Sequence, residues 1–288
     1  MPTAQLNGIE INYEVHGAGT PLVLTHGYTA SLEMWREQVA ALSAKYRLAI
    51  YDMRGHGKTT APADIERYSL ARDYVADKLA LMDHLRIERA HVGGLSMGGM
   101  IAQEFALHHP ERVRALLLFD TGPGSGAGRD PAQRAMFDQM RNMMATLART
   151  RGMGAIVDAM RNSPMAKAMV GAGTDAMPEP VRRHIDGMRT MRVDGYLGGA
   201  KAMQEWAGTL ERLGAISVPT LVLVGENDNL LGPSKAIHDA ITGSRFVLLR
   251  NSGHGTNMWR PDAFLAETLD FLADVDAGKP VEGEFVVP

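Results

Sequence analysis

A serine surrounded by glycines is the first feature of this sequence that could perform chemistry. Ser96 lies in the stretch VGGLSMGGM, between a short apolar run and a helix-length segment. A nucleophilic serine at the end of a strand needs a sharp turn that exposes its side chain. Gly94 and Gly98 lack the Cβ atoms that would crowd such a turn. The pattern therefore predicts a nucleophile at Ser96 rather than a glycine turn with an incidental serine.

A serine hydroxyl also needs a base, because alone it is a weak nucleophile. Of the ten histidines, His254 is distinctive, since it lies between two glycines in NSGHGTN, after the run at 245–249. Loops at the carboxyl ends of parallel strands gather at one edge of a sheet, where Ser96 is also expected. The sequence therefore predicts His254 as the general base rather than a solvated loop histidine.

A carboxylate should hold the tautomer of the base and stabilise its charged form. Asp228 follows the run at 219–224 in GENDN, on the expected edge. Asp120 closes the run at 113–119 and is the rival, with Glu226 a weaker third candidate. A chain order of serine, aspartate and histidine favours Asp228. Asp120 could then be a turn or cap residue.

Two backbone amides should stabilise the oxyanion of an acyl-transfer intermediate. One is the amide of Met97, which follows the nucleophile, and the second is expected on the loop after the run at 21–25. There the sequence reads HGYTA, so Tyr28 is the candidate and Gly27 would allow close approach. His26 is expected to brace this loop by hydrogen bonding.

Other polar motifs are expected to be structural. Arg54 and His56 lie in DMRGHG, a turn after the run at 47–51. The histidines are dispersed and HExxH is absent, so no metal site is predicted. The sequence has no phosphate-binding loop either, and the expected chemistry needs no cofactor.

The elements that must position these residues alternate between strand and helix. The runs are mostly continuous in apolar residues, which is typical of parallel strands buried on both faces. They lie at 21–25, 47–51, 89–94, 113–119, 219–224 and 245–249, and helix-length amphipathic segments include 31–44, 69–85 and 97–109. This alternation predicts an α/β fold with a mostly parallel, doubly wound sheet. Residues 5–16 alternate better and predict an antiparallel edge hairpin that turns at Asn7-Gly8.

One interval breaks this alternation. About a hundred residues separate the run at 113–119 from the next, which predicts a helical cap at 122–212, inserted before the penultimate strand of a core formed by 1–121 and 213–288. The interval contains 12 of the 19 methionines. Methionine packs adaptably around irregular apolar shapes. These residues could therefore pack small helices together or line an apolar pocket.

Composition sets further limits. The chain has 288 residues, a formal net charge of −3 and no cysteine, which excludes disulfides and a cysteine nucleophile. This charge does not favour a nucleic-acid partner or an anionic membrane surface. The N-terminus lacks a basic segment followed by an apolar run, and no apolar stretch approaches membrane-spanning length. The expectation is a cytoplasmic protein that acts on a small molecule, with its oligomeric state open.

The motifs together resemble successive landmarks of the α/β-hydrolase superfamily, over about residues 10–275. They are HGYT, DMRGHG, GLSMGG, HPERV, PTLVLVGEND and SGHGTN. Within that superfamily, the long stretch that begins GLSMGGMIAQEF, together with DGYLGGAKAMQEW, is similar to the branch of 3-oxoadipate enol-lactonases and small carboxylesterases. The resemblance implies a serine hydrolase that cleaves ester or lactone bonds of a small, largely apolar substrate through an acyl-enzyme.

Several alternatives stay open. Ser96 is not the aspartate that dehalogenases and epoxide hydrolases carry, but cofactor-free haloperoxidases (perhydrolases) are similar around this residue. Carbon–carbon hydrolases also resemble this region, although they often have tryptophan where this chain has Gly255. A ligand receptor on the same fold could also keep these residues.

A 3-oxoadipate enol-lactonase would need a cation to face the carboxylate of its substrate. Arg189 and Arg192 could supply one if their segment is helical, or could be solvated surface residues. Enol-lactonases would also imply a tryptophan early in the cap, whereas this interval has only Trp206. The sequence therefore favours uncharged esters or lactones.

Overall fold

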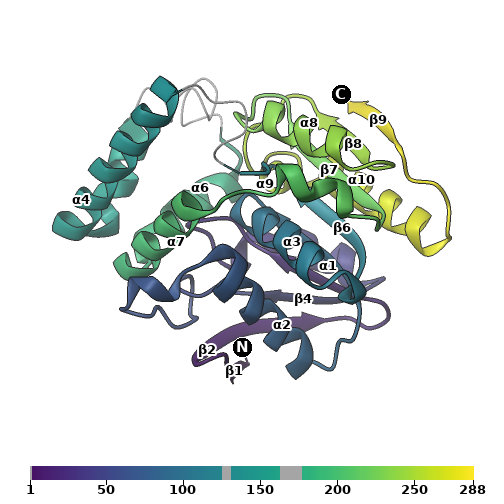
Figure 1. Ribbon diagram of the computed structural model, residues 1–288, viewed down its shortest axis with the longest axis horizontal. Helices are drawn as coiled ribbons and strands as arrows, with labels where there is room; N and C mark the ends of the chain where they lie inside the picture. The colour runs from purple at the N-terminus through teal and green to yellow at the C-terminus, as the bar shows by residue number, and fades with distance from the viewer. Residues whose placement is uncertain (1, 125–130, 163–176) are drawn as a thin grey trace.

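The protein is built around a single sheet with helices on both faces (Figure 1). The computed structural model describes residues 2–124, 131–162 and 177–288. Within them lies a nine-stranded sheet of order β1-β2-β4-β3-β5-β6-β7-β8-β9. Its strands are β1(Thr3–Leu6), β2(Ile9–His16), β3(Pro21–Thr25), β4(Arg47–Tyr51), β5(Ala90–Leu95), β6(Val113–Phe119), β7(Thr220–Gly225), β8(Arg245–Leu249) and β9(Gly283–Val287). This architecture confirms the predicted α/β fold.

The six apolar runs all form strands, and these strands pair in parallel with one another. β1 and β2 form the expected antiparallel hairpin, whose turn is made by Asn7 and Gly8 with positive φ of 49° and 72°. β2 then pairs antiparallel with β4. The carboxyl ends of β5, β6, β7 and β8 consequently share one edge, where the candidate residues lie.

β9 is not predicted from the sequence. Its segment is short, shows no strand-like periodicity and follows a loop. It pairs in parallel with β8 at the sheet edge, and its Phe285 and Val286 are 43% and 56% exposed. Consequently β7, which was expected to be the penultimate strand, is followed by two more strands. Pairing with an existing edge stabilises this segment, and such a contact leaves no local signal in the sequence.

Helices cover both faces of the sheet. Leu81, Phe105 and Ile237 pack α2, α3 and α8 against one face, and Leu42 and Phe271 pack α1 and α10 against the other. The helices and helical turns of the core are η1(Leu32–Trp35), α1(Arg36–Ser43), η2(Ile65–Arg67), η3(Leu70–Tyr74), α2(Val75–His84), α3(Met97–His108), η4(Pro110–Arg112), α8(Leu231–Ala240), α9(Thr256–Trp259) and α10(Pro261–Asp276). This arrangement is the expected double winding.

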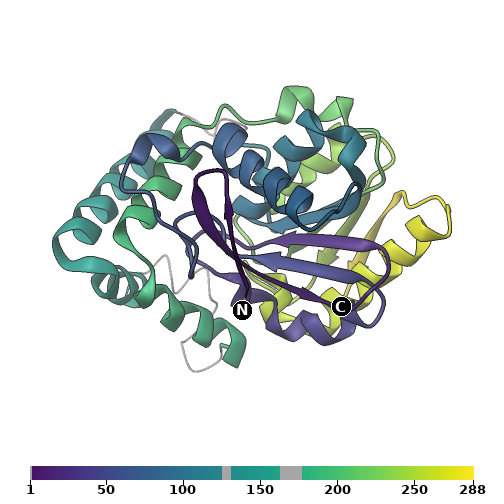
Figure 2. The same ribbon diagram turned by 90° about the horizontal axis from the view of Figure 1, so that it is seen from below.

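The long interval between β6 and β7 is helical. Its elements are α4(Pro131–Asn162), α6(Glu179–Gly187), η6(Met188–Thr190), α7(Val193–Glu205) and η7(Leu210–Ala215). The α4 helix is interrupted at Gly152, where φ is 75°. Figure 1 places α4, α6 and α7 on the side of the molecule away from β9, and Figure 2 shows the same arrangement from below. None of the helices in the described parts of the chain is both long and apolar enough to cross a bilayer.

The methionines of this interval mainly hold its helices together. Met153, Met177 and Met188 are buried, whereas Met143 is 59% exposed. Met191 lines a cavity described below. Met165 and Met169 lie outside the described residues, as does the side chain of Met136. The described methionines therefore pack helices more than they line a pocket.

Candidate active site

Ser96 lies at the sharp turn between β5 and α3. Its φ and ψ are 55° and −118°, a conformation that few residues other than glycine adopt. The backbone on either side is held, because Ser96 N–H donates to the Phe119 carbonyl at 2.9 Å and the Thr121 hydroxyl donates to the Ser96 carbonyl at 2.8 Å. Ser96 is partly exposed between the buried Leu95 and Met97. The turn therefore presents one side chain at the edge of the sheet.

The two flanking glycines make this turn possible. A Cβ on Gly94 would lie 2.2 Å from the Gly98 carbonyl carbon, and a Cβ on Gly98 would lie 2.3 Å from the Thr25 carbonyl oxygen. Both distances are far below any carbon contact observed in proteins, so neither position tolerates a side chain. The close approach of β3, β5 and α3 explains why the serine is surrounded by glycines.

Two backbone amides beside Ser96 lack partners. Met97 N–H is at the N-terminus of α3, and neither it nor Tyr28 N–H donates to any described residue. Gly27, which precedes Tyr28, lies against the nucleophile, since a Cβ built on it would be 3.5 Å from Ser96 Cβ. Free amides at a helix N-terminus favour negative charge. The arrangement can accept an oxyanion formed on a carbonyl that Ser96 attacks.

His254 and Asp228 are in contact. His254 Nδ1 lies 2.9 Å from Asp228 Oδ2. The carboxylate is buried, with a side chain 1% exposed, and its Oδ1 accepts from Leu230 N–H, so it has a fixed orientation. The imidazole is 31% exposed. Asp228 thereby fixes a tautomer that leaves Nε2 of His254 able to accept a proton. Glu226 does not reach His254, because its carboxylate accepts from Asn251 N–H instead.

A rival acid would need a hydrogen bond to His254, and Asp120 makes hydrogen bonds to other residues instead. It is fully buried, and its Oδ2 accepts from Gly255 N–H, Thr256 N–H and the Thr256 hydroxyl at 2.7–3.0 Å. Its Oδ1 accepts from Gly225 N–H at 3.2 Å. Asp120 therefore holds the loop that follows His254 and also the strand end that precedes Asp228. This bracing function was missed in the sequence, which offered only a turn or cap as the alternative.

The two carboxyl groups influence the histidine. Burial and the adjacent charge of Asp228 raise the pKa of Asp120 to about 7, against opposing effects of His254 and Thr256. Burial lowers the pKa of His254, but the hydrogen bond and charge of Asp228 and the charge of Asp120 outweigh it. The net result is a His254 pKa above its ordinary value of 6.5.

This shift predicts how activity depends on pH. Protonated His254 cannot take a proton from Ser96, so kcat/KM should fall about tenfold per pH unit below the His254 pKa. The midpoint should lie above pH 6.5, because the pKa is raised above that value. A kcat/KM profile from acid to neutral pH measures it.

Three other histidines cannot produce that midpoint. Burial lowers the pKa of His26 to about 4, of His56 to about 3 and of His184 to about 4. All three are neutral across the range in which His254 titrates. A midpoint well below pH 6 would therefore contradict the assignment of His254 as the base.

The remaining polar motifs are structural, as expected. His26 Nδ1 lies 2.7 Å from the Gly27 carbonyl, and Nε2 accepts from Met53 N–H at 3.0 Å. Arg54 forms a buried bidentate ion pair with Asp77 on α2. The contacts of His26 tie the loop of Tyr28 to the turn that contains Met53.

A cavity, here named the side cavity, opens next to these loops. Its volume is about 230 Å³, and it lies between the segment Thr29–Met34 and the helices α6 and η6. Met258, four residues after His254, forms part of the wall. Ser96 and His254 do not line it, and the wall approaches them through Thr29 and Ala30, which follow Tyr28, and through Met258. The side cavity could receive the part of a substrate that is remote from the bond that breaks.

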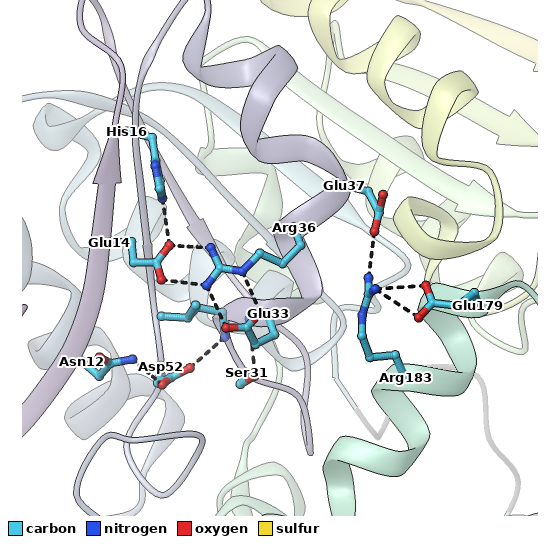
Figure 3. Close-up of polar contacts among 11 residues, drawn as sticks. Asn12, Glu14, His16, Ser31, Glu33, Arg36, Glu37, Asp52, Glu179 and Arg183 are labelled. Carbon is cyan, nitrogen blue, oxygen red and sulfur yellow. Dashed lines mark hydrogen bonds and ion pairs between the residues drawn. The ribbon is translucent and has the colours of Figure 1, made fainter. Parts of the chain in front are cut away.

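Two ion-pair groups lie near the side cavity, and each has one member in its wall, Glu33 in one and Arg183 in the other. Figure 3 shows two groups on facing elements: Arg36 contacts Glu14 and Glu33, and Arg183 contacts Glu37 and Glu179. The hydrogen bond from Arg36 lowers the pKa of Glu14 to about 2. Together the two groups hold four carboxylates and two guanidinium groups. This surplus of negative charge disfavours an anionic ligand.

Arg189 and Arg192 do not form the fork that a carboxylate would need. Residues 191 and 192 are extended, with ψ of 142° and 138°, and separate η6 from α7. Arg189 pairs with Asp158 at 2.5 Å, and Arg192 donates to the Thr59 carbonyl. Neither lines the side cavity. The helical segment on which their pairing depended is therefore broken.

His184, on α6, was considered in the sequence only as a competitor for the role of base. It lies on the face of α6 that carries the buried Val181 and the partly buried Ile185, and it lines the side cavity. The positions 181, 184, 185 and 188 form an inward stripe. A histidine at a position of this apolar stripe is the sequence signal that could have identified His184 as a candidate binding residue.

Several known proteins are similar to this chain in sequence and in structure. A family model described as alpha/beta hydrolase fold matches residues 20–261. A putative carbamate hydrolase from Azorhizobium caulinodans is 29% identical over 96% of this chain and 100% of its own length. The 3-oxoadipate enol-lactonase 2 of Acinetobacter baylyi is 28% identical over 91% and 92%. The crystal structure of an enol-lactonase from Burkholderia xenovorans is 31% identical, with a TM-score of 0.79, and the match covers 94% of this chain and 100% of that one.

Proposed function

The chain belongs to the α/β-hydrolase fold family, and we propose that it is a serine hydrolase that cleaves an ester or lactone bond. The substrate is small, uncharged and largely apolar. The observation that carries this proposal is the strained Ser96 next to the amides of Met97 and Tyr28, which donate to no described residue, at the edge where Asp228 orients His254. A ligand-binding role alone would leave this arrangement without a purpose.

The proposed reaction proceeds in two halves. His254 Nε2 takes the proton of the Ser96 hydroxyl as its oxygen attacks the carbonyl carbon, and the amides of Tyr28 and Met97 stabilise the oxyanion. When the intermediate collapses, His254 returns the proton to the leaving alkoxide, and an acyl-enzyme remains on Ser96. Water then attacks that acyl group by the same sequence and releases the acid.

The helical interval is proposed to act as a cap. In this division 122–212 forms the cap, and 1–121 with 213–288 forms the core. Tyr28 supports it, since its hydroxyl donates to the carbonyl of Tyr196 on α7 at 2.5 Å and the two rings stack 5.4 Å apart. The side cavity also has walls from both parts. A cap in this place would shield the acyl-enzyme from bulk water.

The charges around the side cavity predict the substrate class. We expect uncharged esters or lactones to have a higher kcat/KM than 3-oxoadipate enol-lactone, because Arg183, the arginine that lines the side cavity, is already held by two carboxylates. A carboxylate that enters must displace one of them or remain unpaired, which is unfavourable. Steady-state hydrolysis of both classes by the wild-type protein measures the ratio.

Arginine variants test the alternative that the protein is an enol-lactonase. Arg189→Ala and Arg192→Ala should leave the ratio between the two substrate classes unchanged, because both guanidinium groups are engaged away from the side cavity. Arg183→Ala serves as the comparison, since Arg183 does line that cavity. If the anionic lactone is preferred and any one of these variants selectively loses it, the enol-lactonase function replaces the one proposed.

A further inference from the structure

The side cavity is next to the reacting groups and is small. Thr29 and Ala30 follow Tyr28 directly, and Met258 in α9 is four residues beyond His254, so three wall residues follow residues of the proposed site closely in the chain. The volume of the side cavity is about 230 Å³. That space suits a short acyl or alkoxy group, and its chemistry depends on which polar groups remain free within it.

Most polar side chains of the wall already have partners. Three hydroxyl groups form hydrogen bonds with nearby backbone groups. Those of Thr29 and Thr190 donate to carbonyls, and that of Ser31 accepts from an N–H group. Glu33 is paired with Arg36, and Arg183 is paired with two glutamates. His184 also lies in this wall and has two ring nitrogens. Neither nitrogen has a hydrogen-bond partner among the described residues.

His184 is also close enough to His254 to feel its charge. Its pKa is lowered first by burial and then by the charge of His254, which places the two rings within electrostatic range of each other. The resulting value of about 4 makes His184 neutral at physiological pH. A neutral imidazole has one donor and one acceptor. It can bind a hydroxyl or a carbonyl group but supplies no positive charge to a carboxylate.

We propose that the side cavity binds the part of the substrate remote from the scissile bond, and that His184 forms a hydrogen bond with a neutral hydroxyl or keto group on that part. The preferred substrate is therefore an ester or lactone with a second, uncharged oxygen function. This inference rests on the proposed hydrolase function and narrows its substrate class. His184 is a substrate-binding residue in this scheme and transfers no proton.

Matched substrates and variants test the inference. One pair differs on the acyl side (p-nitrophenyl levulinate and p-nitrophenyl valerate), and a second differs on the alcohol side (hydroxyethyl acetate and propyl acetate). Each polar member has nearly the shape of its apolar partner. The variants are His184→Phe, which removes the hydrogen bond, and His184→Gln, which retains a donor and an acceptor. His108→Phe, the same exchange at the exposed end of α3, is the control.

In at least one pair, the wild type should prefer the polar substrate in kcat/KM. His184→Phe should reduce that preference by roughly tenfold to a hundredfold, because the substrate oxygen then lacks its partner. His184→Gln should keep most of the preference, and His108→Phe should keep all of it. An unchanged ratio of polar to apolar substrate in His184→Phe, for both pairs, would overturn the inference.

A binding measurement separates this inference from the proposed reaction. In a Ser96→Ala background the same esters can be titrated calorimetrically without turnover. If the wild type hydrolyses none of them, the proposed function is wrong, and binding alone decides the role of His184. Selective loss of the polar ester on adding His184→Phe would support the inference, and equal affinity for the polar ester with and without that change would reject it.

Discussion

Ser96→Ala should abolish hydrolysis of esters and lactones while leaving the fold intact. A triad enzyme that loses its nucleophile loses on the order of 10⁶ in kcat. The expected loss is of that size because the Ser96 hydroxyl is the group that would form the acyl-enzyme. The substitution removes one oxygen from a partly exposed side chain, and it keeps a residue with a Cβ at the strained turn. Thermal stability should therefore change little.

Steady-state kcat and a thermal melt together measure this result. Ser43→Ala is the matched control, since Ser43 ends α1 and, among the described residues, its hydroxyl donates only to the Ala40 carbonyl, at 3.4 Å. It should retain wild-type activity. A Ser96→Ala protein that keeps even a tenth of wild-type turnover would remove the nucleophile assignment and the proposed function with it.

The second large effect concerns the two buried aspartates. Asp228→Ala should reduce kcat by about 10⁴, a loss typical of the acid member of a triad. His254 then loses both its orientation and the charge that raises its pKa. Asp120→Ala should reduce kcat much less but should destabilise the protein more. It leaves the amides of Gly225, Gly255 and Thr256 without their acceptor, at about 1–3 kcal/mol for each buried donor.

Activity and stability must be measured on both variants. The Asp228 variant is expected to lose more activity, and the Asp120 variant is expected to lose more stability. Asp120→Asn is a useful companion, since it retains one acceptor oxygen and should recover part of the stability. A larger loss of kcat in Asp120→Ala than in Asp228→Ala, at a temperature where both are folded, would move the role of acid to Asp120.

Much of this protein can be predicted from short stretches of its sequence. Six continuous apolar runs predict the parallel strands, and the structure confirms them, because a strand buried on both faces must be apolar wherever it lies in the chain. Ser96 between its glycines is equally local, since the crowding that excludes side chains arises where one strand meets one helix. Chain order alone also favoured Asp228 over Asp120, and the structure places Asp228 in contact with His254.

Other features depend on contacts between distant segments. Asp120 lies 135 residues before the Gly255 amide that it accepts from, and nothing near either residue signals that contact. β9 forms because β8 offers an edge, and Arg189 and Arg192 diverge because the chain is extended between η6 and α7.

His184 is the clearest case. The inward stripe of α6 is visible in the sequence, but what that stripe faces is set by how the helix packs against the core. An apolar period of 3.6 residues shows which face of a helix is buried, but it does not show which segment packs against that face. The sequence by itself therefore determined the parallel strands of the sheet and predicted which residues lie at its edge. Only the tertiary structure decided which residue of the helical interval lines the side cavity without a partner among the described residues, because packing between segments far apart in the chain leaves no periodic trace.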